Sequence, residues 1–274
     1  MEYIKNGKLC FFDTHAHYYD DRFYGEENPE GAEALLEQLF DDGLLGVINV
    51  GTNASTNKLA IKQAQRFENM YAAVGIHPAD LAHTEIGLDA ELGELVDLLD
   101  VDKREENKIV AIGEIGLDYY WEPYDKELQK KCLEAQLKLA CIHDLPVVIH
   151  DRDAHGDCLE RVLKYPNVRG VFHSYSGSAE MAKELVKRGW YISFSGVVSF
   201  KNAAKAKEVA AVVPDDKILI ETDAPYLAPH PFRGKLNHSG RLIHTATALA
   251  EARGCTLEDI ARLTRENTGV LFGI

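Results

Sequence analysis

The sequence has no apolar run that approaches the roughly 18 to 20 residues of a membrane-spanning helix. The opening residues, M-E-Y-I-K-N-G, also lack the order of basic and then apolar residues that marks a secretory signal. We therefore expect a cytoplasmic protein that has no membrane partner.

Cysteine pairs of the C-x-x-C type are missing as well. The five cysteines are odd in number and scattered: Cys10, Cys132, Cys141, Cys158 and Cys255. This arrangement indicates neither a disulfide framework nor a zinc knuckle. We expect reduced thiols in or near the core.

Positive charge is in short supply. The chain carries 30 Lys and Arg residues against 44 Asp and Glu residues, for a formal net charge of -14. Such a charge repels polyanions on average and argues against a protein that coats long nucleic acid through a broad basic surface. A local phosphate site remains compatible with it.

Internal repeats, low-complexity tracts and linkers are also lacking. With 274 residues, of which 46% are hydrophobic, the chain can bury a large core. Because α/β barrels of 200 to 250 residues or more commonly form one domain, we expect a single domain over residues 1–274.

What the sequence does have is an alternation of short β-rich runs with longer helical patterns. The predicted strands are residues 9–15, 46–51, 71–77, 109–115, 146–150, 169–173, 190–196 and 217–223. Most are continuous apolar runs, which is typical of parallel strands covered on both faces. Residues 127–140 show helical spacing, and T-L-E-D from Thr256 resembles a capping box before a final helix. Eight such units predict an α/β fold, the (β/α)8 TIM barrel.

Polar side chains end several of these runs. They are His15, His17, Glu114, His150, His173 and Asp223. Chemistry in such barrels sits at the carboxyl ends of the strands. Residues two apart share a strand face, so His15 and His17 point the same way, with Asp13 below them.

Four imidazoles and two carboxylates buried together require a counter-ion, so we predict two divalent metal ions. Barrel closure makes the first and eighth strands neighbours. We expect His15, His17 and Asp223 to hold one ion and His150 and His173 the other, with Glu114 as a bridge.

Each residue alone has an ordinary explanation. The His15-x-His17 pair also fits a solvated strand edge, and a lone His or acid at a strand end is often only hydrogen-bonded. Their joint placement favours the metal site. His77, in G-I-H-P, either approaches the substrate or belongs to a structural turn.

The chain resembles the TatD family of metal-dependent hydrolases, within the amidohydrolase-like barrels. The resemblance rests on D-T-H-A-H (13–17), G-I-H-P (75–78), G-E-I-G-L-D-Y-Y (113–120), P-V-V-I-H-D-R-D-A (146–154), H-S-Y-S-G-S (173–178), F-K-N-A (200–203), E-T-D-A-P-Y-L-A-P (221–229) and F-R-G-K (232–235). It implies a two-metal (β/α)8 hydrolase with magnesium-stimulated deoxyribonuclease activity, including 3′ to 5′ exonuclease action. By motif, the six residues above correspond to the family's ligands.

Two motifs depart from the family's usual pattern. The chain has H-S-Y-S-G where the family often has H-C-F-S-G, which leaves His173 in place. It has L-N-H-S-G after R-G-K where the family often has R-N-E-P. The second departure changes a loop over the expected site and makes the substrate preference less secure than metal binding.

The expected reaction is attack of a metal-activated water on phosphorus, with Asp223 orienting that water and accepting its proton. Arg152, Lys201, Arg233 and Lys235 are candidate phosphate contacts. Lys201, Arg233 and Lys235 also fit an ordinary solvated face, and Arg152 also fits an ion pair with Asp118 or Asp151.

Two other functions are open at this point. The same centre could hydrolyse a carboxylic ester, such as an aminoacyl ester on tRNA, or the barrel could be a metal-binding scaffold in DNA processing. The imidazole ligands favour zinc or manganese over magnesium, although magnesium is the ion that the resemblance implies.

Overall fold

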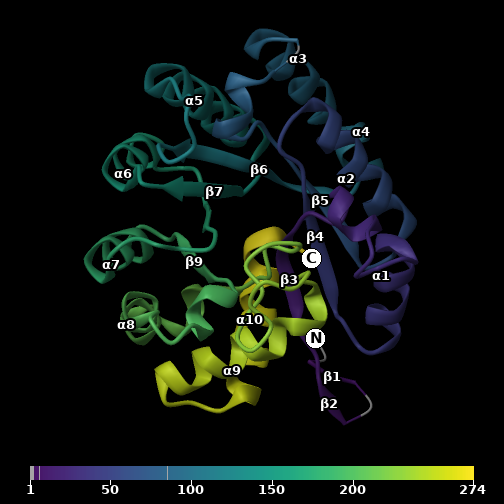
Figure 1. Cartoon of the computed structure of the whole chain (residues 1–274). Helices are drawn as coiled ribbons and strands as arrows, with labels where there is room; N and C mark the ends of the chain where they lie inside the picture. The colour runs from purple at the N-terminus through teal and green to yellow at the C-terminus, as the bar shows by residue number, and fades with distance from the viewer. Residues whose placement is uncertain (1–2, 6, 85) are drawn as a thin grey trace. The chain divides into compact units, whose positions relative to one another are not determined.

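The computed structural model describes residues 3–5, 7–84 and 86–274. The chain divides into two compact units, one formed by Met1–Asn49 with Ser174–Ile274 and the other by Val50–His173. Each unit contributes parallel strands and the helices that cover them (Figure 1).

The first unit is built on parallel strands from both ends of the chain. They are β3 (Phe12–Ala16), β4 (Gly46–Val50), β9 (Tyr191–Phe194) and β10 (Ile218–Ile220). Strand β3 pairs with β4, and β9 pairs with β10. A bridge between Ala16 and Ala224 joins the segment after β10 to the end of β3. This bridge brings the first and last strands together, as the predicted closure requires.

Helices of the first unit follow its strands. They are α1 (Gly31–Asp41), α7 (Ala179–Lys187), α8 (Ala204–Val212), α9 (Leu242–Arg253) and α10 (Leu257–Phe272), with the short 3-10 helices η1 (Asp21–Tyr24), η3 (Gly196–Ser199), η4 (Asp215–Lys217) and η5 (Ser239–Arg241). Helix α10 packs on β10 and β3. The Thr256 side chain accepts from Asp259 N, and the Asp259 side chain accepts from Thr256 N, which confirms the predicted capping box.

The second unit is a run of four parallel strands in chain order. They are β5 (Met70–Val74), β6 (Ile109–Asp118), β7 (Val147–Arg152) and β8 (Gly170–Phe172). Its helices are α2 (Ala54–Arg66), α3 (Leu88–Leu98), α4 (Val101–Glu106), α5 (Lys126–His143) and α6 (His155–Leu163), with η2 (Pro78–Ala82). Helix α5 covers β6, and α2 covers β5 (Figure 1). The predicted helix at 127–140 is therefore the centre of α5.

Eight parallel strands thus alternate with helices along the chain, which confirms the predicted α/β fold of the (β/α)8 TIM-barrel class. Their apolar runs are buried almost throughout, as expected of strands covered on both faces. The single-domain organisation stays a prediction.

The boundaries of most strands differ from the sequence prediction. Strands β5 and β10 end at Val74 and Ile220, so His77 and Asp223 lie in the segments that follow them. Two further differences concern the first strand and the pair β6 and β7. The run at 9–15 begins in a separate hairpin of β1 (Ile4–Lys5) and β2 (Lys8–Leu9), and β3 starts only at Phe12. Strands β6 and β7 continue beyond their apolar runs because Gly116, Leu117 and Asp118 pair with His150, Asp151 and Arg152. Backbone pairing, rather than side-chain polarity, sets these ends.

The five cysteines are free thiols, as expected. Cys10, Cys132 and Cys158 are buried, whereas Cys141 is exposed on α5, against the expectation of a core position. In the described part of the chain, no helix combines the length and the apolar character needed to cross a membrane.

Candidate metal site

His15 lies in β3 and His17 directly follows it, and both lie against Asp223 in the first unit. The two Nε2 atoms are 3.1 Å apart, and Oδ1 of Asp223 lies 3.6 Å from Nε2 of His15 and 3.4 Å from Nε2 of His17. His15 is fully buried and His17 nearly so, which contradicts a solvated strand edge. The arrangement brings two imidazole nitrogens and one carboxylate oxygen to a common point.

Backbone hydrogen bonds position Asp223 for this contact. Asp223 N donates to His15 O at 2.9 Å, and His17 N donates to Ala224 O at 2.7 Å. Asp223 itself has a φ of 57°, in the left-handed region that Asp tolerates better than most residues. The turn after β10 thereby directs the carboxylate toward the end of β3.

Asp13 anchors the same region from below and was not assigned a role of its own from the sequence. Its Oδ1 accepts from Thr222 N at 3.0 Å, and its Oδ2 accepts from the hydroxyls of Thr222 and Ser239 at 2.5 and 2.6 Å. Burial raises the pKa of Asp13 to about 6, although these donors counteract the shift. The carboxyl therefore ties β3 to the segment that follows β10.

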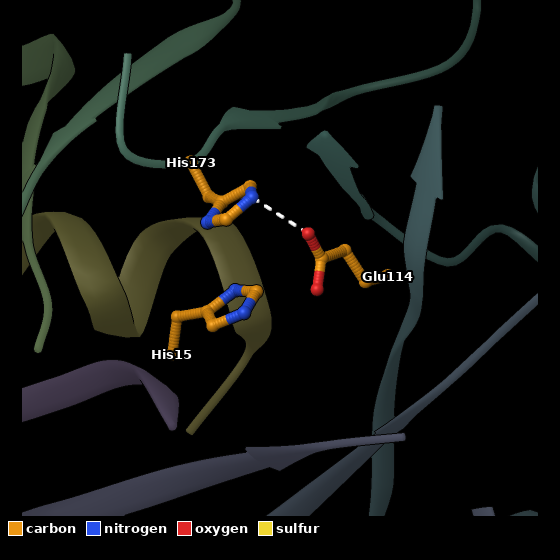
Figure 2. Close-up of side chains that lie close together, drawn as sticks. All are labelled: His15, Glu114 and His173. Atoms are coloured by element: carbon orange, nitrogen blue, oxygen red, sulfur yellow. Dashed lines mark ion pairs between the residues drawn. The ribbon is translucent and has the colours of Figure 1, made fainter. Parts of the chain in front are cut away.

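Glu114, His150 and His173 form a second group, in the second unit. Oε1 of Glu114 lies 2.8 Å from Nδ1 of His150 and 2.7 Å from Nε2 of His173. Figure 2 shows the His173 ring directed at this carboxylate oxygen. The two facing ring nitrogens are 3.2 Å apart.

Asp118 holds the other side of the His150 ring. Its Oδ2 lies 2.9 Å from Nε2 of His150, while its Oδ1 accepts from the backbone N–H groups of Tyr120 and Trp121. Burial alone raises the pKa of Asp118, but the bonds from His150 and the two N–H groups outweigh it and hold the pKa at about 2. An ionised Asp118 makes Nε2 of His150 the protonated nitrogen and leaves Nδ1 as the ligand atom.

His77 also approaches this group. Its Nε2 lies 3.5 Å from Oε1 of Glu114, and its Nδ1 accepts from Ala79 N at the start of η2. His77 therefore shapes the turn at the start of η2, and its approach to a substrate stays a prediction.

Gly116 allows β6 and β7 to approach closely beside His150. Its φ is 151°, and a Cβ at this position would lie 1.9 Å from the backbone oxygen of His150. A larger residue would push apart the strands that carry Glu114 and His150.

Both groups have the donor set of a transition-metal site. Ligands about 2.1 Å from a tetrahedral metal ion lie about 3.4 Å from one another. The separations of 3.1, 3.4 and 3.6 Å among His15, His17 and Asp223 fit this value. The distances of 2.7 to 3.2 Å around Glu114 are slightly shorter, as in a hydrogen-bonded cluster. The residues present therefore suit zinc or manganese.

The structure brings the six predicted ligands together as two groups of three. That they are ligands, that all six share one centre, and that Glu114 bridges two ions stay predictions. The contact between Asp118 and His150 was not predicted from the sequence, because G-L-D-Y-Y gives no local sign that β6 continues to Asp118.

The candidate phosphate contacts have varied surroundings. The guanidinium of Arg152 lies 3.9 Å from the centre of the Tyr120 ring, and that of Arg233 lies 4.6 Å from the centre of Phe200. Lys235 Nζ lies 3.9 Å from Glu27 Oε1. Lys201 is exposed on the turn before α8. Their contact with a substrate stays a prediction.

Comparison with known proteins agrees with this geometry. Residues 12–273 match the family model described as TatD related DNase. The metal-dependent hydrolase YabD of Bacillus subtilis (strain 168) is 39% identical over 96% of this chain and 99% of its own length. The metal-dependent hydrolase YjjV of Escherichia coli (strain K12) is 32% identical over 97% of this chain and 99% of its own.

The fold agrees as well. The crystal structure of YjjV, a TatD homologue from E. coli K12, superposes with a TM-score of 0.85 at 31% identity and covers 96% of this chain and 98% of its own. A TatD family hydrolase from Entamoeba histolytica, at 22% identity, has the same fold with a TM-score of 0.80 and covers 96% of this chain and 97% of its own. This chain belongs to the TatD family of metal-dependent hydrolases.

Proposed function

We propose that this hydrolase cleaves phosphodiester bonds of DNA, and that it does so as a 3′ to 5′ exonuclease. The observation that carries the proposal is the convergence of His15, His17 and Asp223, three ligand atoms at separations that suit one divalent ion. The description of the matching family model, TatD related DNase, supports DNA as the substrate.

The proposal assigns one ion to each group of three. His15, His17 and Asp223 would hold the first, and Glu114, His150 and His173 would hold the second. Asp118 supports the second by fixing the His150 ring, a role that carboxylates commonly have beside metal-bound histidines.

Bound divalent ions would supply the positive charge that activates water and neutralises the phosphoryl oxygens. The Asp223 carboxylate then orients the attacking water and accepts its proton. Because Asp223 is partly exposed, a water molecule can reach it.

Charge also favours a phosphate ester over a neutral ester. A divalent ion held by His15, His17 and the Asp223 carboxylate would leave about +1 at this site. The chain as a whole carries -14, so this site is a cationic focus on an acidic protein.

A substrate panel tests the proposal. One manganese-loaded preparation is given single-stranded and duplex oligonucleotides, bis(p-nitrophenyl) phosphate, and a series of carboxylic and aminoacyl esters. We expect DNA cleavage, with oligonucleotides labelled at the 5′ end shortening one nucleotide at a time. Turnover of the carboxylic esters without DNA cleavage would replace a phosphodiesterase with an ester hydrolase.

Variants of the site distinguish turnover at this site from the activity of a contaminating hydrolase. Asp223→Asn and Glu114→Gln should each lose most of the turnover, whereas Glu160→Gln, at an exposed ion pair with Lys164 on α6, should keep it. Full activity in both site variants would favour a metal-binding scaffold. Immediate release of the label from oligonucleotides labelled at the 5′ end would contradict the proposed 3′ to 5′ direction.

A further inference from the structure

The segment from Ala224 to Ala250 stands out by its charge, and we call it the basic segment. It has no Asp or Glu, although the chain has 44 of them. Its basic side chains are Arg233, Lys235, Arg241, His230, His238 and His244. The segment follows Asp223 directly and includes the L-N-H-S-G departure from the family pattern.

Arg241 is the central cation of this segment. Its guanidinium lies 4.3 Å from the centre of the Phe232 ring, which the His244 ring also contacts, at 5.1 Å between ring centres. Nη1 of Arg241 is buried and has no hydrogen-bond partner in the described part of the chain. A buried guanidinium N–H without an acceptor is unfavourable unless an ordered water or a ligand supplies one.

His238 presents a second buried donor position. Nδ1 of His238 is also buried and lacks a partner among the described residues. Its ring packs so closely on Gly240 that a Cβ there would lie 3.0 Å from Nδ1. Burial lowers the pKa of His238 to about 4, with Arg241 adding to the shift, so the ring is neutral near pH 7 and offers one N–H.

The N-terminus of α9 lies in the same place. Arg241 is the last residue of η5 and the N-cap of this 12-residue helix, and Leu242 N already donates to Ser239 O. The first turn has no acidic residue, and His244 is the third residue of the helix. The start of α9 therefore adds no carboxylate beside Arg241.

Glu27 balances only part of this charge. Its Oε2 accepts from Leu236 N at 2.9 Å, and its Oε1 lies 3.9 Å from Nζ of Lys235. Burial lowers the pKa of Arg241, and Glu27 acts in the opposite direction. Glu27 therefore acts on Lys235 and Arg241, whereas Asp20 accepts from the Tyr226 hydroxyl of the basic segment.

Hydrogen bonds fix the basic segment relative to the first ligand group. Ser239 Oγ donates to Oδ2 of Asp13, and His15 N donates to Oδ1 of the same carboxyl at 3.3 Å. Asn237 Nδ2 donates to Thr222 O at 2.9 Å, just before Asp223. A ligand held by Arg241 would thus have a defined position relative to His15 and Asp223.

We propose that Arg241 and His238 bind a phosphate group of the substrate other than the one that is cleaved. That the phosphate belongs to a DNA substrate rests on the proposed function. That the subsite binds phosphate does not depend on it. Arg241 would position a polynucleotide substrate, whereas a substrate with a single phosphate would not contact this residue.

Inorganic phosphate is the first probe. Equilibrium dialysis with labelled phosphate compares the metal-loaded wild type, Arg241→Gln, Arg241→Lys and the control Arg188→Gln, an exposed arginine paired with Glu184 on α7. The loss of a charge-assisted contact should weaken one class of phosphate sites by about tenfold or more in Arg241→Gln, with partial recovery in Arg241→Lys. Equal phosphate binding in wild type and Arg241→Gln would overturn the subsite.

Kinetics identify the source of the phosphate. For Arg241→Gln, KM for an oligonucleotide should rise about tenfold more than KM for bis(p-nitrophenyl) phosphate. An equal change for both substrates, with phosphate binding still lost, overturns the substrate assignment and indicates a free phosphate or another phosphate ester. If the wild type cleaves no DNA, the proposed function fails while the dialysis result still decides the subsite. Far-ultraviolet circular dichroism and thermal unfolding without phosphate establish that Arg241→Gln is folded.

Discussion

Nε2 of His150 lies 2.9 Å from Oδ2 of Asp118, while Nδ1 of the same ring faces Glu114 at 2.8 Å. The ring is therefore held between a carboxylate that sets its tautomer and a carboxylate that belongs to the proposed ligand group. In the proposed two-ion site, Asp118 would therefore position His150 for the second ion.

Asp118→Asn should weaken the binding of one metal ion by roughly 10-fold to 100-fold, as loss of an outer partner commonly does. The neutral amide of the asparagine has no negative charge that would keep the proton on Nε2 of His150. Competition with a chromogenic chelator measures both dissociation constants, with Glu160→Gln as the control for loss of a carboxylate on the surface. Unchanged constants for both ions would remove the assigned role.

Asp223→Asn should reduce the metal content of a dialysed preparation from two ions per chain to one. Loss of this ligand also removes about 3 kcal/mol of transition-state stabilisation, or roughly 100-fold in turnover. Elemental analysis together with the rate on bis(p-nitrophenyl) phosphate checks both effects. Two retained ions in this variant would contradict the assignment of Asp223 to the first group.

Acid should destabilise the fold through His238. Burial lowers the pKa of His238 to about 4, whereas the unfolded side chain titrates near 6.5. As the pH falls from about 6.5 toward 4, the unfolded state takes up a proton that the folded state does not, so stability decreases. At pH 5 the loss is about 2 kcal/mol.

Urea unfolding at pH 7.5 and pH 5 measures this loss in the wild type and in His238→Gln. The glutamine does not titrate, so the variant should lose about 2 kcal/mol less between the two pH values. The same pH dependence in both proteins would show that His238 is not the responsible group.

Thr256→Ala should destabilise the protein by about 1 kcal/mol because it removes the N-cap of α10. Thr247→Ala is the matched control, since this exposed hydroxyl lies inside α9 and bonds only to the preceding turn at Ile243 O. We expect it to be neutral or slightly stabilising, as alanine is the better helix former. Chemical unfolding measures the free energy of unfolding of both variants. Equal effects of the two substitutions would contradict a stabilising role of the capping box.

The sequence was sufficient wherever the determining interactions are local or periodic. Continuous apolar runs gave the eight strands, because a parallel strand buried on both faces needs such a run. The two-residue period of a strand placed His15 and His17 on one face, and T-L-E-D placed the start of α10 at Thr256. These features depend on neighbours within a few residues.

Contacts between distant residues were decided only by the tertiary structure. The contact of Asp118 with His150 depends on the paired extension of β6 and β7. Asp13 accepts a hydrogen bond from Ser239, which lies 226 positions further along the chain. The buried donors of Arg241 and His238 likewise appear only once Phe232 and Gly240 pack around them. Local pattern determines which face a side chain occupies, but the atoms that surround it are set by packing between segments that the sequence keeps far apart.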